Sequence, residues 1–189
     1  MLMSLEARLL VTLSAWRSAP VWTVAFSGGL DSTVLLHLLA SLAQREQLPP
    51  LRAIHIQHGL QAAAQAWPAH CQRVCDELGV PLVLREVQVQ AGASLEQAAR
   101  DARYAVFVGL LGANEVLLTA QHRDDQAETL LFRLLRGAGA RGLAAMPASR
   151  SLGAGQLVRP LLSVSRAELE DYALANGLDW VEDPSNCDE

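Results

Sequence analysis

Residues 21–32 read VWTVAFSGGLDS, an apolar segment followed by two glycines set among polar residues. The apolar part predicts a buried strand, and the pattern after residue 32 predicts a helix. Glycines let the backbone approach an anion closely, serine hydroxyls donate to it, and a helix N-terminus favours negative charge. Asp31 adds a carboxylate of the kind that phosphate-bound Mg²⁺ prefers. We interpret residues 27–32 as a phosphate-binding loop; the alternative is a turn that only caps the helix.

Two better-known nucleotide motifs do not fit. The mononucleotide P-loop ends in Gly-Lys-Ser or Gly-Lys-Thr, whereas this sequence contains no lysine. Gly137, Gly139 and Gly142 have the G-x-G-x-x-G spacing of dinucleotide-binding folds, but a predicted helix precedes them where that motif requires a strand. We therefore reject a nicotinamide-binding function.

Composition indicates one globular domain. The chain has 189 residues, of which 51% are hydrophobic and 19% charged. No apolar run is long enough to cross a bilayer, and residues 1–16 predict an amphipathic helix rather than a signal peptide. The three cysteines, Cys71, Cys75 and Cys187, form no recognisable disulfide framework. We expect a cytoplasmic protein without a membrane partner.

Charge is unevenly distributed along the chain. The net charge of −5 argues against a surface devoted wholly to nucleic acid. Residues 119–166, however, hold many arginines and few acids. Two interpretations remain open for that stretch, a local basic face or a solvated helix surface.

Strand-like and helix-like segments alternate. The predicted strands are residues 21–26, 51–57, 81–89, 115–120 and 158–162, and the predicted helices are residues 32–44, 62–78, 94–111, 124–135 and 165–177. This order predicts an α/β fold, a doubly wound, mainly parallel five-stranded sheet with helices on both faces. Residues 137–155 predict a long irregular loop. Because ligands bind at the carboxyl ends of parallel strands, loops 27–32 and 121–125 are expected to meet at one site.

The loop at residues 119–129 concentrates polar side chains where a strand ends and a helix begins. Asp125 and Glu128 are three residues apart, so their carboxylates share a helix face. Capping of the helix by Asp124 or Asp125 is one interpretation. Binding of a cation, either a metal ion or a substrate ammonium group, is the other.

Several further stretches occur in a family-specific order. They read QHGL at 57–60, EQAARDARY at 96–104, HRDDQAET at 122–129, LRGAGARGL at 135–143, RPLL at 159–162 and WVEDPSN at 180–186. With the SGGLDS loop, they resemble the tRNA(Ile)-lysidine synthases, a family of PP-loop ATP pyrophosphatases. The resemblance covers nearly the whole chain. It implies an adenine nucleotide alpha hydrolase-like fold, related to the Rossmann fold.

The resemblance implies a ligase reaction in two steps. ATP adenylates the wobble cytidine of tRNA(Ile) with a CAU anticodon, and free lysine then displaces AMP to give lysidine. ATP and Mg²⁺ are the implied cofactors, tRNA(Ile) and lysine are the implied partners, and a homodimer is possible. The implied catalytic residues are Asp31, Arg103, Asp125 and Glu128, with Asp31 also the metal ligand. The implied nucleotide-binding residues are Ser27, Gly28, Gly29, Leu30, Asp31, Ser32, His58 and His122. Those implied for lysine or tRNA are Asp125, Glu128, Arg100, Arg136 and Arg141.

The sequence also departs from the family. Gln121 stands where the family commonly has histidine, and glutamine does not ionise near neutral pH. We expect residues 1–189 to form a single catalytic domain without the family's C-terminal tRNA-binding domains. Two alternatives are another PP-loop enzyme, such as a tRNA thiolase, and a non-catalytic nucleotide-binding module.

Overall fold

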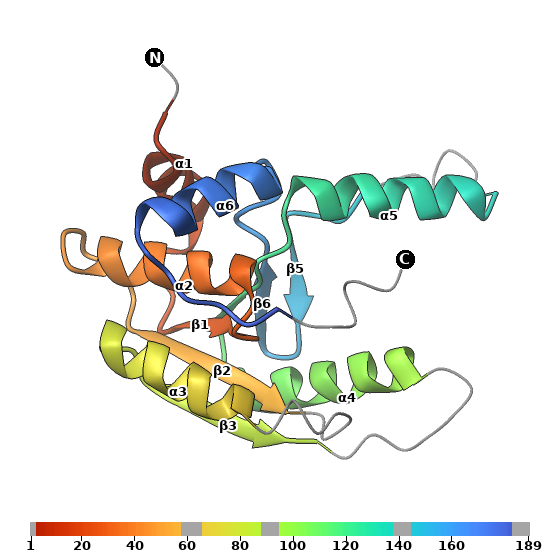
Figure 1. Ribbon diagram of the computed structural model, residues 1–189. Helices are drawn as coiled ribbons and strands as arrows, with labels where there is room; N and C mark the ends of the chain where they lie inside the picture. The colour runs from red at the N-terminus through yellow and green to blue at the C-terminus, as the bar shows by residue number, and fades with distance from the viewer. Residues whose placement is uncertain (1–2, 58–65, 88–94, 138–144, 183–189) are drawn as a thin grey trace.

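The computed structural model describes residues 3–57, 66–87, 95–137 and 145–182 (Figure 1). Its six-stranded sheet has the order β3-β2-β1-β4-β6-β5, and every neighbouring pair is parallel except β5 with β6. The strands are β1 (Trp22–Ala25), β2 (Leu51–Gln57), β3 (Leu82–Glu86), β4 (Val116–Leu118), β5 (Ser149–Leu152) and β6 (Gly155–Val158). The helices are α1 (Leu5–Leu13), α2 (Leu30–Ala43), α3 (Trp67–Leu78), α4 (Leu95–Leu110), α5 (Arg123–Leu135) and α6 (Arg166–Ala175).

Helices cover both faces of the sheet, as the sequence predicts. Alternate residues of β1 and β4, such as Val24 and Leu118, face a large core with α1, α2, α3 and α6. Leu117 and Ile54 face a smaller core on the other side, where α4 contributes Phe107. The predicted α/β, doubly wound class is therefore confirmed.

The strand order positions the site. β1 pairs with β2 on one side and with β4 on the other, with Trp22 opposite both Leu51 and Val116. Since these strands are parallel, the loop after β1 and the loop after β4 leave the sheet at the same edge. After β1 the chain adds β2 and β3 on one side of the sheet and then returns to add β4 on the other side. The carboxyl edge at β1 is therefore the topological switch point of the fold.

The predicted strand count was wrong, and so was the irregular loop from residue 149 onward; residues 138–144 of that predicted loop lie outside the described residues. The sheet has a sixth strand, β5, within residues 137–155, and the strand predicted at 158–162 is instead β6, which ends at Val158. β5 is a mostly polar edge strand with exposed residues in its middle, so it lacks the apolar run of a buried strand. Leu161 was assigned to a strand because it is apolar, but it is buried in the turn before α6.

Helix α5 projects away from the sheet (Figure 1). None of its residues is buried, and its second half exposes Leu131, Phe132, Leu134 and Leu135. Within the described residues, no helix is both long and apolar enough to cross a membrane.

Candidate functional site

The loop between β1 and α2 is held by its own hydroxyl groups. The Ser32 hydroxyl accepts a hydrogen bond from the Ser27 amide at 3.2 Å and lies 3.0 Å from the Ser27 hydroxyl. It also lies within donating distance, 3.1 Å, of the Gly29 carbonyl, to which the Thr33 hydroxyl donates at 2.9 Å. These hydrogen bonds hold a tight turn at the N-terminus of α2.

Gly28 and Gly29 have different roles in this loop. Gly28 has a φ of +85°, and a Cβ there would lie 3.0 Å from the Cys71 sulfur of α3. A larger residue is therefore excluded both by backbone conformation and by close packing. Gly29 is the N-cap residue of α2 and has no side chain with which to satisfy the first amides of the helix. That helix end is accordingly suited to an external anion.

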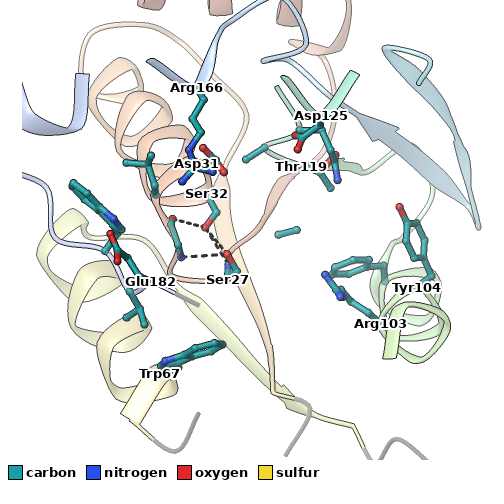
Figure 2. Close-up of a pocket in the computed structure, with 18 residues that line it drawn as sticks. Ser27, Asp31, Ser32, Trp67, Arg103, Tyr104, Thr119, Asp125, Arg166 and Glu182 are labelled. Atoms are coloured by element: carbon teal, nitrogen blue, oxygen red, sulfur yellow. Dashed lines mark hydrogen bonds between the residues drawn. The ribbon is translucent and has the colours of Figure 1, made fainter. Parts of the chain in front are cut away.

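A cavity of about 570 Å³ opens beside the loop. Ser27, Asp31 and Ser32 line it on one side, and Arg103 and Tyr104 of α4 lie across from them (Figure 2). The ends of β4, α5 and α6 and residues 180–182 complete the wall. Segments far apart in the sequence thus converge at the switch point, as expected for the ligand site of an open α/β sheet.

Asp31 points into this cavity from the first turn of α2. Its Oδ1 atom is buried and has no hydrogen-bond partner among the described residues. Burial raises the pKa of Asp31, although the charges of His122 and Arg166 act in the opposite direction. A buried carboxylate oxygen without a donor is costly unless a cation or a proton joins it. Asp31 therefore fits a metal-binding role.

His122 contacts Asp31 from the other loop. The Nε2 atom of His122 lies 3.6 Å from Asp31 Oδ1, and the ring is almost fully buried. Its Nδ1 accepts a hydrogen bond from the Asp124 amide, so the neutral ring carries its proton on Nε2, facing Asp31. The two loops predicted to meet do so through this pair.

The N-terminus of α5 is capped by histidine rather than by aspartate. His122 is the N-cap residue, and the Asp125 carboxylate accepts a 2.8 Å hydrogen bond from the His122 amide, which completes a capping box. Asp124, one of the two predicted caps, instead accepts a hydrogen bond from the Arg166 amide of α6. Asp125 lines the cavity as well, so capping and ligand binding are compatible roles for this carboxylate.

The predicted site residues divide into three groups. Ser27, Gly29, Leu30, Asp31, Ser32, Arg103 and Asp125 line the cavity. A second group does not line it: Gly28 and His122 are buried, Glu128 is exposed on α5, Arg136 is exposed directly after α5, and Arg100 is exposed on α4. His58 and Arg141 lie outside the described residues.

Arg166 and the aromatic residues of the wall were not among the predicted site residues. Arg166 begins α6 and lines the cavity, and its charge acts on both Asp31 and Asp125. The sequence predicts a helix that starts at residue 165, and a cation directly after that start, near the carboxyl edge of the sheet, was the available signal. Trp67, Tyr104 and Trp180 also line the cavity and offer rings on which a base can stack.

The switch point of this open α/β sheet has a glycine-serine loop, a helix N-terminus without a side-chain cap, and an aspartate oxygen without a hydrogen-bond partner among the described residues. These features define a nucleotide phosphate-binding domain. Comparison with known families agrees: the chain belongs to the PP-loop domain family, which it matches over residues 2–189. This membership implies the use of ATP.

Curated relatives are closely similar but longer. A tRNA(Ile)-lysidine synthase of Pseudomonas aeruginosa is 72% identical over 184 residues, and one of Pseudomonas fluorescens is 69% identical over 184 residues. Each alignment covers 97% of this chain but 42% of the relative. The chain thus spans less than half the length of these proteins.

A solved structure shows the same fold at low sequence identity. The U34-tRNA thiolase NcsA of Methanococcus maripaludis, determined with its [4Fe-4S] cluster, superposes with a TM-score of 0.74 at 17% identity. The match covers 95% of this chain and 65% of that one. At this identity the likeness concerns the fold alone.

Proposed function

We propose that this chain is the catalytic part of an enzyme that joins free lysine to the wobble cytidine of a tRNA(Ile) with a CAU anticodon. The unpartnered Asp31 oxygen, facing a phosphate-binding loop inside a cavity, carries the chemical part of the proposal. The names of the relatives with up to 72% identity support the substrate. We further propose that the additional length of these relatives contributes to tRNA binding, in a cytoplasmic enzyme.

The nucleotide-binding half of the site follows from the loop. The amides and hydroxyls of residues 27–32 would hold the β- and γ-phosphates of ATP, with the α2 N-terminus behind them. Bound Mg²⁺ would supply positive charge to the departing pyrophosphate, and Asp31 would hold it. Magnesium needs only one or two carboxylates beside phosphate oxygens and water, so the single buried oxygen of Asp31 is sufficient.

The cationic residues of the cavity would act on the α-phosphate. Arg103 and Arg166 line the wall on different sides, and guanidinium groups suit the charge that develops on a phosphoryl group. In the first step the cytidine O2 attacks the α-phosphorus, the α–β bond breaks and pyrophosphate leaves. In the second, the lysine amine attacks C2, the C2–O2 bond breaks, AMP leaves and the amine loses a proton.

Lysine has two amino groups, and the one that does not attack C2 remains a cation. A carboxylate in the site would hold that ammonium group. Asp125 lines the cavity and keeps one oxygen beyond the capping hydrogen bond, which makes it the stronger candidate. Glu128 lies one turn further along α5 and is exposed. We propose that Glu128 binds the ammonium group of lysine at the entrance to the cavity and that Asp125 binds it within the cavity.

The cysteines do not favour the thiolase alternative. Burial raises the pKa of both Cys71 and Cys75 to about 12, and the Cys71 sulfur packs against Gly28 and His55 in the core. Buried thiols of this kind are unreactive. Cys71 packs beneath the loop at Gly28, and neither of these two thiols lines the cavity.

Lysine-dependent AMP formation tests the proposal. The chain, ATP, Mg²⁺ and a tRNA with a CAU anticodon are mixed with lysine, or with arginine or ornithine as matched cations. We expect lysine alone to increase AMP formation and to enter the tRNA. We expect Asp31→Ala to abolish pyrophosphate release and Glu128→Ala mainly to raise the KM for lysine. Nucleotide binding without pyrophosphate release would instead identify a binding module.

A further inference from the structure

A cluster of arginines surrounds one tyrosine beside the cavity. Two guanidinium carbons lie over the Tyr104 ring, that of Arg100 at 5.2 Å and that of Arg150 at 5.1 Å from its centroid. Burial alone would raise the pKa of Tyr104. A hydrogen bond with Arg150 and the charges of Arg100, Arg150 and Arg159 outweigh burial and lower that pKa. We call these residues the Tyr104 arginine cluster, and it consists of Arg100, Arg103, Tyr104, Arg150 and Arg159.

The four arginines come from three parts of the fold. Arg100 and Arg103 lie on α4, Arg150 lies on the edge strand β5, and Arg159 follows β6. The turn between β5 and β6 packs closely on α4, since a Cβ at Gly153 would lie 3.1 Å from the Val108 side chain. The edge strand β5 thus brings Arg150 to helix α4, which already carries Arg100 and Arg103.

The charges of the cluster are not balanced by nearby acids. None of its arginines forms an ion pair with a carboxylate in the described part of the chain, whereas six other arginines do. The buried Arg159 donates to the Pro147 carbonyl, but its Nε atom has no partner among described residues. Asp101, the nearest acid in sequence, accepts a hydrogen bond from Gln97 instead. Four like charges held together without an acid indicate that an anion completes the cluster.

The position of the cluster indicates the size of that anion. Arg103 and Tyr104 line the cavity, as Figure 2 shows, whereas Arg100 and Arg150 are exposed and do not line it. The cations therefore continue from the cavity wall to the outer surface. A single nucleotide occupies only the cavity, but a polynucleotide that places one base in the cavity must continue outside it. A guanidinium group has five N–H donors in a planar fork, and this geometry suits phosphate oxygens.

We propose that the Tyr104 arginine cluster binds the RNA backbone next to the nucleotide that enters the cavity, with Arg150 as an outer phosphate contact. This inference rests on the proposed function, because that function makes RNA the substrate. It assigns a role to the β5–β6 hairpin, which the reaction itself does not use. Of the two interpretations left open for residues 119–166, it favours a local basic face over a solvated helix surface.

The test measures binding of a fluorescent anticodon stem–loop with a CAU loop over a series of KCl concentrations. We expect Arg150→Ala to weaken binding about fivefold and to reduce the salt slope by about 0.7, the value for one phosphate contact on a single strand. Arg150→Lys keeps the charge but not the forked donor geometry of the guanidinium group, so it should keep the slope while losing part of the affinity. ATP affinity, measured calorimetrically, should remain within about twofold of the unsubstituted chain, because Arg150 lies outside the cavity wall.

Arg85→Ala is the matched control. Arg85 is also exposed and lies on β3, the opposite edge strand of the sheet, without a described carboxylate partner. Equal losses in Arg85→Ala and Arg150→Ala would overturn the inference, as would loss of ATP binding in Arg150→Ala or no RNA binding by the unsubstituted chain. RNA binding that depends on Arg150 without lysine transfer would instead contradict the proposed function and leave the inference standing.

Discussion

Asp31 and His122 lie 3.6 Å apart, the carboxylate on the first turn of α2 and the imidazole at the cap of α5. The pair joins the two loops that leave β1 and β4, and it does so with an acidic oxygen that has no other described partner. A buried carboxylate oxygen of this kind costs stability that a bound cation would restore.

Replacement of Asp31 separates stability from function. The pKa of Asp31 is raised, so the folded state favours its protonated form, and stability falls as pH rises from 3.8 through that raised pKa. Asp31→Asn removes this cost at neutral pH, and we expect the melting temperature to rise by about 2–4 °C. Pyrophosphate release should be lost. A lower melting temperature would contradict the assignment of Asp31 as a destabilised, functional carboxylate.

Two substitutions of His122 separate capping from contact with Asp31. His122→Ala removes the acceptor for the Asp124 amide and should cost about 1 kcal/mol, or about 2–4 °C in melting temperature. His122→Asn restores a capping acceptor and should keep the stability of the unsubstituted chain. Both should reduce the rate of pyrophosphate release. Full activity in His122→Asn would show that the imidazole serves only as a cap.

The buried thiols should be protected from modification. A rise in pKa from 9.0 to about 12 lowers the thiolate fraction of Cys71 and Cys75 about 1,000-fold near pH 8. In a Cys187→Ser variant, reaction with Ellman's reagent should be slow in the native protein and rapid in guanidinium. Rapid reaction of two thiols before unfolding would mean that the packing beneath Gly28 is wrong.

The β5–β6 hairpin depends on a glycine. A Cβ at Gly155 would lie 2.4 Å from the Glu115 carbonyl oxygen, which is backbone and cannot rotate away. Gly155→Ala should therefore lower the melting temperature by about 2–12 °C, since overpacking typically costs about 1–3 kcal/mol. Gly109→Ala is the control: its Cβ meets nothing within 4 Å, and α4 should tolerate or favour it. Similar melting temperatures for the two variants would contradict this packing.

Much of the fold follows from local sequence patterns. The apolar strand before residue 27, the glycine pair and the helix after it appear in the structure where the pattern predicts them, as do β2 and α5. These segments have strong periodicity and clear end signals. β5 was not predicted because an edge strand buries few side chains. Arg150 and Ser151 in its middle are exposed and give no apolar pattern.

The site was only partly predictable for a related reason. Asp31 and Asp125 belong to motifs, and each motif lies at a strand end that the sheet topology brings together. Arg166 and Trp67 reach the cavity through the packing of α6 and α3, which local sequence does not encode. His122 and not Asp124 caps α5, and the Asp124 carboxylate instead accepts a hydrogen bond from the Arg166 amide of α6. This contact between two helices could not be read from local sequence.

A structure of the chain with Mg²⁺ and α,β-methylene-ATP tests the central claim most directly. We predict that the two terminal phosphoryl groups lie against residues 27–32, with Mg²⁺ on the free oxygen of Asp31. A triphosphate bound at any other place, with this loop empty and Asp31 unliganded, would contradict the account.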